Sequence, residues 1–261
     1  MSSWGDFLVN EIEGFRVEKG KVAIWSIGGC GFVIKTPKQI VYIDPYFGGS
    51  VPPETLRMIP VPFEPAMIRN ADVVLCTHEH LDHCHKESLS PIHSNTQALF
   101  VAPSSAVKSE LSWGLDKGRI REVKPGDKVS LKDVAIHTVE GYDPLSEGAV
   151  MYVLQSGEIT LFHSGDVWYF GGFAKVGDQW NIDVAFINFG NNPPGKQLYL
   201  TPCDFLRAAR DLRAKKAVPM HWDMWKHAYQ DPIIVQEIAR KLFPNIEVHI
   251  MRLGDRLIHP T

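Results

Sequence analysis

The segment VVLCTHEHLDHCH (73–85) places four histidines and one aspartate within the eight residues 78–85. It continues from an apolar run that predicts a buried strand, and side chains on a loop at a strand's end can converge on one point. A His-x-His alternation also puts two imidazoles on the same side of an extended backbone. Imidazole and carboxylate together suit zinc, manganese or iron. We therefore predict that His78, His80, Asp82 and His83 bind one or two divalent metal ions.

The chemistry expected of such a site is hydrolysis. Divalent ions held by protein ligands lower the pKa of water toward ~7 and polarise a carbonyl or phosphoryl oxygen. Asp82 is a candidate catalytic residue, which would orient or deprotonate the attacking water as well as bind metal. The competing interpretation is a solvated histidine-rich loop. It is disfavoured because imidazoles and carboxylates that become buried need partners.

The elements that must position this cluster are mainly strands. Short β-branched runs bounded by Gly, Pro, Asp or Asn recur along the chain and predict strands over 21–27, 31–36, 40–46, 72–77, 133–139, 149–154, 158–166, 183–190, 214–220 and 246–252. Several are almost continuously apolar, which is typical of strands buried on both faces of a layered α/β fold. Helices are predicted over 103–115, with Ser104 or Ser105 as N-cap, over 201–217, with Thr201 as N-cap, and over 231–244. The Pro-rich stretch 50–65 predicts a long loop. The order favours a single domain over 1–261, built as a sandwich of sheets with helices outside.

Composition narrows the classes of partner. The 261 residues are 44% hydrophobic and 22% charged, with a formal net charge of -3, so nothing global attracts nucleic acid or an anionic membrane. No apolar run approaches the roughly 18 residues that span a bilayer, and the N-terminus does not resemble a signal peptide. Four widely spaced cysteines without a CxxC pair indicate reduced thiols. We expect a cytoplasmic enzyme with a small-molecule substrate; the sequence leaves the oligomeric state open, a homo-oligomer included.

The motif H-x-H-x-D-H after an apolar strand resembles the metallo-β-lactamase superfamily, and further motifs follow in the order of that family: IDPY (43–46), HSGD (163–166) and VPMHWD (218–223). The resemblance implies a four-layer αβ/βα sandwich. It also implies a division of ligands in which the first metal is held by His78 and His80, the second by Asp82, His83 and His221, with Asp166 between them and Asp44 supporting the ligands without binding metal. Taken alone, Asp44 and Asp166 can equally be turn residues, and His221 a core histidine.

One ligand of that family is missing. A third histidine for the first metal is expected after the strand DVAIHTV (133–139), but EGYDPLSEG (140–148) follows. Asp143 occupies the best-aligned position, with Glu140 and His137 as alternatives. A carboxylate there makes the site harder, which favours manganese or iron relative to zinc. The expected cofactors are Mn²⁺ or Zn²⁺, with Fe²⁺ as a further candidate.

The absence of the third histidine indicates a subgroup of this superfamily. The motifs W-x-I-G-G-C-G-F, THEHLDH, G-Y-D, HSGD, FINFG and VPMHWD together resemble the L-ascorbate-6-phosphate lactonase-like metal-dependent hydrolases. The resemblance implies hydrolysis of a sugar-phosphate lactone such as L-ascorbate 6-phosphate, or of a related small ester. In the loop 188–202, Asn191 and Lys196 are candidate substrate contacts, and the helix N-terminus near Thr201 favours an anion. His163 is a candidate proton shuttle, or else a strand-end histidine bonded to backbone.

Three other functions compete. A phosphodiesterase or ribonuclease on the same scaffold would use the same ligands, but the acidic balance and the lack of a basic tract argue against it. A thioesterase of the glyoxalase type is expected to carry the third histidine and a helical tail. A non-catalytic metal-binding protein is disfavoured by Asp82 and Asp166, since a purely structural site has no need of an open water position.

Overall fold

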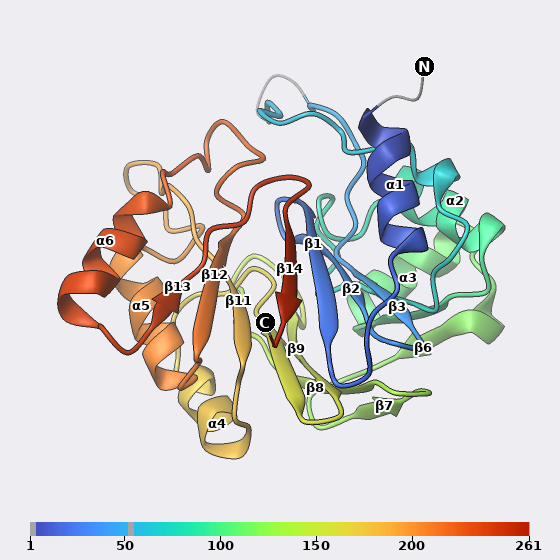
Figure 1. Ribbon diagram of the computed structural model, residues 1–261. Coiled ribbons are helices and arrows are strands. Elements are labelled where there is room, and N and C mark those ends of the chain that lie inside the picture. Colours follow the sequence, from blue (N-terminus) through green and yellow to red (C-terminus); the bar gives the residue numbers. More distant parts are fainter. Residues whose placement is uncertain (1–3, 52–54, 261) are drawn as a thin grey trace.

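Two seven-stranded sheets lie between two groups of helices in the computed structural model, which describes residues 4–51 and 55–260 (Figure 1). The first sheet has the strand order β14 (Arg256–His259), β1 (Val22–Gly28), β2 (Gly31–Lys35), β3 (Ile40–Ile43), β4 (Val73–Leu75), β5 (Leu99–Ala102) and β6 (Ile120–Glu122). The second has the order β13 (Glu247–Val248), β12 (Lys216–Met220), β11 (Val184–Asn188), β10 (Ile159–His163), β9 (Val150–Ser156), β8 (Ala135–Glu140) and β7 (Lys128–Ser130).

The helices cover the outer faces of the two sheets. The first sheet is covered by α1 (Trp4–Gly14), α2 (Lys86–Asn95) and α3 (Ser104–Ser112), and the second by α4 (Gly172–Gln179), α5 (Pro202–Asp211) and α6 (Ile233–Leu242). None of the helices in these described ranges combines the length and apolar composition needed to cross a bilayer. The predicted four-layer αβ/βα sandwich is confirmed.

Strand periodicity explains why both faces of each sheet are buried. In β1, Val22 and Ile24 belong to the core between the two sheets, whereas Ala23 and Trp25 belong to the core beneath α1, α2 and α3. Successive side chains of a strand point to opposite faces, so a strand covered on both sides must be apolar at every position. All seven residues of β1 are buried accordingly.

Parallel pairing decides where loops can meet. Strands β3, β4, β5 and β6 pair in parallel, and so do β10, β11, β12 and β13. The carboxyl ends of parallel neighbours lie at the same edge of a sheet, which is where ligand sites of open α/β sheets form. Loops after β3, β4, β10 and β12 are therefore brought together.

Several local predictions need correction. The predicted strand over 246–252 is short, because only Glu247–Val248 pairs with β12. The sequence did not predict β5, β6, β7 or the last strand of the chain, β14. Helices α1, α2 and α4 were also missed; α2 contains Pro91 and has little apolar content, so its helical signal is weak. Neither Ser104 nor Ser105 caps α3, because Ser104 already begins the helix and Pro103 precedes it.

Two local predictions are confirmed. The hydroxyl of Thr201 accepts a hydrogen bond from the Asp204 amide at 3.2 Å and caps α5. In the predicted loop over 50–65, the described part contains only two isolated bridges, Val51–Thr55 and Arg57–Trp225, before a short 3-10 turn at Pro65–Met67. Residues 52–54 of that loop lie outside the described part of the chain.

Candidate metal centre

The predicted ligands come from loops of both sheets. His78, His80, Asp82 and His83 follow β4, Asp143 follows β8, Asp166 follows β10 and His221 follows β12. Two groups of side chains form at this edge, each with one ligand atom per residue lying within 4.8 Å of the others: His78, His80 and Asp143 in one, and His83, Asp166, His221 and Cys30 in the other.

In the first group, two imidazoles and a carboxylate face one another. His78 Nε2 lies 2.9 Å from His80 Nδ1, and His80 Nδ1 lies 3.8 Å from Asp143 Oδ2. Burial and the nearby His83 lower the pKa of His78 well below its usual value, which keeps this ring neutral and able to bind a metal. Asp143 therefore lies with the two histidines, as expected of the third ligand of the first metal.

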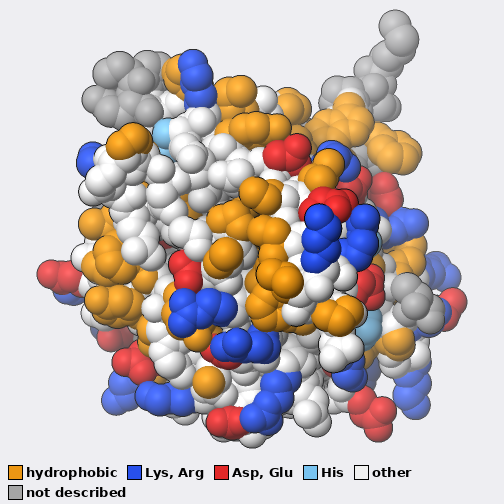
Figure 2. Space-filling view, turned by 90° about the vertical axis from the view of Figure 1, so that its left-hand side faces the viewer, with side chains coloured by type: hydrophobic (Ala, Val, Ile, Leu, Met, Phe, Trp, Pro, Cys, Tyr) orange, Lys and Arg blue, Asp and Glu red, His pale blue; other side chains and the backbone are white. Residues whose placement is uncertain are grey.

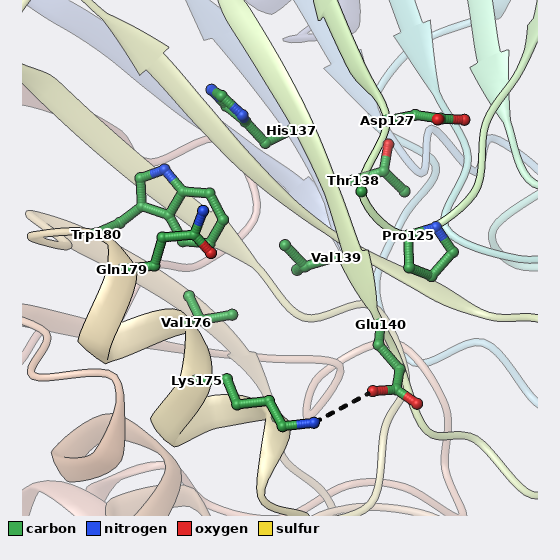
Figure 3. Close-up of a pocket in the computed structure, with 12 residues that line it drawn as sticks. Pro125, Asp127, His137, Thr138, Val139, Glu140, Lys175, Val176, Gln179 and Trp180 are labelled. Atoms are coloured by element: carbon green, nitrogen blue, oxygen red, sulfur yellow. Dashed lines mark ion pairs between the residues drawn. The ribbon is translucent and has the colours of Figure 1, made fainter.

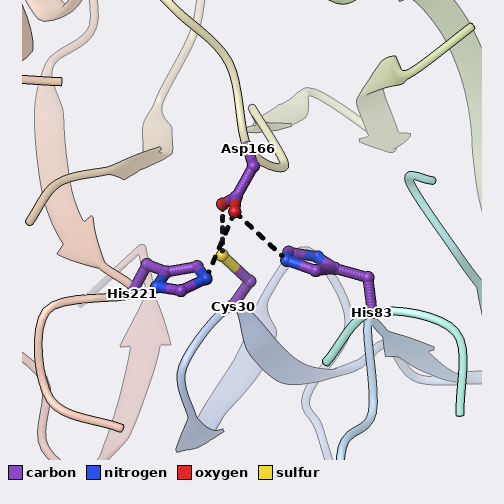
Figure 4. Close-up of side chains that lie close together, drawn as sticks. All are labelled: Cys30, His83, Asp166 and His221. Atoms are coloured by element: carbon purple, nitrogen blue, oxygen red, sulfur yellow. Dashed lines mark hydrogen bonds and ion pairs between the residues drawn. The ribbon is translucent and has the colours of Figure 1, made fainter. Parts of the chain in front are cut away.

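In the second group, the Asp166 carboxylate lies between two histidines (Figure 4), and the Asp82 carboxylate lies beside this group. His221 Nε2 lies 3.1 Å from Asp82 Oδ2 and 3.2 Å from Asp166 Oδ2, and His83 Nε2 lies 3.5 Å from Asp166 Oδ2. Burial opposes the charged form of His221, but the carboxylates of Asp166 and Asp82 raise its pKa to about 10. The same negative charge that stabilises the proton on His221 would stabilise a divalent cation bound at this position.

Hydrogen bonds of Asp44 set the orientation of two histidines. Its Oδ2 accepts from His83 Nδ1 at 2.7 Å and from the Thr77 hydroxyl at 2.7 Å. Because the Thr77 hydroxyl donates to Asp44, His78 Nδ1 at 3.0 Å must donate to the Thr77 oxygen. In its neutral form, each histidine is thus left with an unprotonated Nε2 facing the site, the state that metal ligands need. These contacts favour the supporting role of Asp44 over that of a simple turn residue.

The donor set passes a chemical test for a cation. His80 Nε2 lies 3.1 Å from the Leu145 carbonyl oxygen and must donate to it, so Nδ1 of the neutral ring is unprotonated. Two bare nitrogens, this one and His78 Nε2, then face each other at 2.9 Å, a contact that a shared cation, either a proton or a metal ion, would stabilise. His83 Nε2 is buried and, apart from its 3.5 Å ion-pair contact with Asp166, has no hydrogen-bond partner among the described residues. Nitrogen and carboxylate donors of this kind fit Zn²⁺, Mn²⁺ or Fe²⁺.

The contacts of His163 differ from those of a proton shuttle. Its Nδ1 accepts from the Gly165 amide at 3.1 Å and its Nε2 donates to the Cys30 carbonyl at 2.9 Å. Both ring nitrogens are therefore engaged by backbone. The structure favours the alternative left open by the sequence, a strand-end histidine that holds the backbone beside the site.

His137 and Glu140 lie in a different place from the metal ligands. Both line a cavity of about 240 Å³ beside α4, where the Glu140 carboxylate faces Lys175 (Figure 3). His137 Nε2 is within hydrogen-bond distance of Gln155 at 2.9 Å. Neither residue belongs to the two groups described above, so Asp143 is the better candidate for the third ligand.

A second cavity, of about 210 Å³, opens directly on the metal ligands. Its wall contains Asp82, Asp143, Asp166 and His221 together with Tyr199, Trp225 and His227. Among the described residues that line it, neither Asn191 nor Lys196 is present; Asn191 instead bonds the His227 carbonyl. The two candidate substrate contacts thus lie outside the cavity wall. Leu198 and Tyr199, from the same loop, line the cavity instead.

Two neighbours of the site were missed by sequence reasoning. Cys30 Sγ lies 3.5 Å from Asp166 Oδ1, and His227 Nε2 lies 3.1 Å from the Tyr199 hydroxyl. The turn sequence Gly-Gly-Cys-Gly after an apolar strand was a usable signal for Cys30, because glycines mark a close approach of backbone. His227 is separated from His221 by five residues, and nothing in that spacing singles it out.

Comparison with known proteins identifies the family of the chain. Residues 39–222 match the family described as the beta-lactamase superfamily domain. The chain is 30% identical to the probable L-ascorbate-6-phosphate lactonase UlaG of Escherichia coli (strain SMS-3-5 / SECEC), over 88% of this chain and 77% of that protein. It is 31% identical, with the same coverage, to the protein of that description from Escherichia fergusonii.

Solved structures share the fold at lower identity. Igni18, a metallo hydrolase from Ignicoccus hospitalis, superposes with a TM-score of 0.75 at 17% identity, covering 92% of this chain and 99% of that one. An isothiocyanate hydrolase from Delia radicum gut bacteria gives a TM-score of 0.74 at 17% identity, covering 90% and 98%. Fold and site together define a metal-dependent hydrolase of the metallo-β-lactamase type. The chain belongs to the beta-lactamase superfamily.

Proposed function

We propose that this chain hydrolyses a small lactone or ester of the sugar-acid type, with L-ascorbate 6-phosphate and lactones of related structure as the substrates to test first. The observation that carries the proposal is the small cavity that opens on the metal ligands, since its volume of about 210 Å³ suits a small molecule. The resemblance to lactonases named for this substrate supports the choice of chemistry.

The cavity wall favours a compact substrate over a polymer. Of the described residues that line it, none is Lys or Arg, while Tyr199 and Trp225 supply aromatic surface. The molecular face on the side of α5 and α6 carries both signs of charge interspersed with apolar side chains (Figure 2). A polyanion is bound mainly by continuous basic surface. The proposal therefore includes neither a nucleic-acid nor a membrane partner.

Different residues of the chain would have different roles in ring opening. Ions bound by the two groups would activate water and polarise the carbonyl. The Asp82 carboxylate accepts a hydrogen bond from Trp225 Nε1 at 2.6 Å, which holds it at the cavity wall, where it can orient water and take a proton from it. Water adds to the carbonyl carbon, the bond from that carbon to the ring oxygen breaks, and the leaving oxygen gains a proton.

The pair Tyr199 and His227 is placed to assist the leaving oxygen. Burial, together with the charge of Asp166, raises the pKa of Tyr199, so its hydroxyl keeps its proton and can donate. Its ring lies 4.8 Å from that of His221, which fixes it over the second ligand group. His227 Nε2, 3.1 Å from the hydroxyl, is the neighbour through which a proton can be replaced.

An activity panel tests the proposal. Purified metal-loaded protein is assayed on L-ascorbate 6-phosphate, unphosphorylated sugar lactones, an aryl ester, a simple phosphodiester and a tRNA precursor. We expect metal-dependent ring opening of a lactone and a loss of ~100-fold or more in kcat for Asp82→Asn, the scale of a lost acid–base group. The surface variant Asp178→Asn serves as the matched control. The proposal would be refuted if the phosphodiester or the tRNA precursor were turned over faster than the lactones. It would also be refuted if Asp82→Asn kept its full turnover and metal content.

A further inference from the structure

One thiol lies among the residues of the second ligand group (Figure 4). Cys30 is 3% exposed, and its Sγ lies 3.5 Å from Asp166 Oδ1. One ligand atom from each of Cys30, His83, Asp166 and His221 lies within 4.8 Å of the other three. In a tetrahedral site, zinc–sulfur and zinc–nitrogen bonds of about 2.3 and 2.1 Å place the two ligand atoms about 3.6 Å apart. Small side-chain shifts therefore suffice to bring all four onto one ion.

The turn that carries Cys30 is fixed to the loops that carry the other ligands. The Cys30 carbonyl accepts from His163, and the Gly29 carbonyl accepts from the His221 amide at 3.0 Å. The Gly29 amide donates to Asp223 Oδ1 at 3.1 Å. The thiol is thus held in place by backbone contacts to the strand ends after which Asp166 and His221 lie.

The remaining thiols have other surroundings. Cys203 is exposed at the start of α5, and Cys76 and Cys84 are buried under α3 beside Glu110. None of these three belongs to a group with the histidine ligands. Among the four cysteines, Cys30 alone combines burial with a position next to an expected metal.

We propose that Cys30 binds, as a thiolate, the metal ion held by His83, Asp166 and His221. This inference rests on the metal-dependent function proposed above. On binding, the S–H bond breaks, the sulfur–metal bond forms and the proton passes to solvent, so metal uptake releases a proton. The competing role for the thiol is donation of a hydrogen bond to Asp166, which would position that carboxylate without contact to the metal.

Thiolate ligation changes the expected choice of metal. The sequence suggested a hard, oxygen-rich centre because Asp143 replaces a histidine. A soft sulfur ligand favours zinc over manganese at the second position. The two metal positions then differ in the metal that they prefer. The position at His78, His80 and Asp143 has the harder ligands, and the position at Cys30 has the softer ligand.

Cobalt substitution tests this without any substrate. Full-length protein is stripped of metal and titrated with Co²⁺, which gives visible absorption from any bound site and a near-ultraviolet sulfur-to-cobalt charge-transfer band only where a thiolate binds. We expect both signals in the unchanged protein. The charge-transfer band is expected to vanish in Cys30→Ser and Cys30→Ala and to persist in Cys84→Ser and Cys203→Ser. Thermal unfolding of each variant confirms that it is folded.

Metal selectivity supplies the second readout. Cys30→Ser is expected to weaken zinc binding by ~10-fold or more while manganese binding changes less. Visible cobalt absorption without the charge-transfer band, or a band that survives in Cys30→Ser, overturns the role of Cys30 and leaves the metal-dependent hydrolase proposal intact. Absence of both absorptions counts against the metal centre itself.

Discussion

Asp44 illustrates how much a single buried side chain contributes to this site. Its backbone has φ of 45°, in the left-handed region that aspartate and asparagine tolerate better than most residues. From there its carboxylate reaches His83 directly and His78 through Thr77. His83 cannot rotate without breaking a buried charge-assisted hydrogen bond, and His78 cannot rotate without losing its bond to the Thr77 hydroxyl.

Asp44→Asn should therefore weaken metal binding while leaving the fold intact. Asparagine adopts the same backbone conformation, but its amide lacks the charge that holds His83 Nδ1–H and can favour the wrong tautomer. We expect a ~10- to 100-fold loss of metal affinity, measured by competition with a chelating dye. The denaturant midpoint of the metal-free protein should change little; unchanged affinity would show that Asp44 does not orient the ligands.

Asp143→His is the matching test of the first ligand group. It restores the residue type that the family usually has, so we expect zinc content to rise relative to manganese in protein loaded with equal amounts of both ions. Glu140→His is the control, because Glu140 lies by the cavity beside α4 and not with His78. Elemental analysis decides the outcome, and identical metal content in Asp143→His and the unchanged protein would count against Asp143 as a ligand.

The site depends on the turn between β1 and β2, an element that sequence reasoning did not connect with the metal ligands. Gly28 and Gly29 have φ of 92° and 62°, and a Cβ on Gly29 would lie 2.7 Å from the Met224 side chain. The register of the two strands shifts at this point. Glycine is needed here because a left-handed backbone is what allows the turn to meet the loop of His221.

Gly29→Ala should then impair metal binding as well as stability. The left-handed conformation costs alanine about 1–2 kcal/mol, and displacement of the turn should disturb the Gly29–His221 contact. Gly20→Ala is the control, since Gly20 has φ of 82° but no atom of the described part of the chain within 4 Å of the added Cβ. Both variants should lower the unfolding midpoint, while only Gly29→Ala should reduce metal affinity, by roughly 10-fold, the scale of a lost supporting contact.

At the scale of the whole molecule, one buried carboxyl group makes stability depend on pH. Glu110 of α3 is fully buried next to Cys76 and Cys84, and no described residue forms a hydrogen bond with its oxygens. Burial raises its pKa from 4.5 to about 8. Between these two values the folded protein keeps a proton that the unfolded chain has released, so the free energy of unfolding falls as pH rises through this window.

Glu110→Gln should flatten that dependence. The variant cannot ionise, so the loss of stability between pH 5 and pH 8, on the order of a few kcal/mol in the unchanged protein, should largely disappear. Urea unfolding at several pH values gives the measurement, with Glu122→Gln, an exposed position, as control. Parallel pH profiles for Glu110→Gln and the unchanged protein would contradict this assignment.

The sequence by itself determined the local half of the site and the class of fold. His78, His80, Asp82 and His83 share one loop after one strand, so backbone geometry alone predicts that they meet. Apolar periodicity likewise predicts the central strands, since burial on both faces demands it at every position. Short or edge elements such as β14 and α2 escaped prediction because tertiary pairing, not local composition, stabilises them.

Only the tertiary structure decided which distant residues join that loop. Sequence spacing left Asp143, Glu140 and His137 as alternatives, and the path of the chain after β8 places Asp143 alone beside His78. Cys30 is 136 residues away from Asp166, and the two meet because separate sheets pack face to face. Local sequence cannot encode such contacts in a readable way, since they depend on the packing of the whole sandwich.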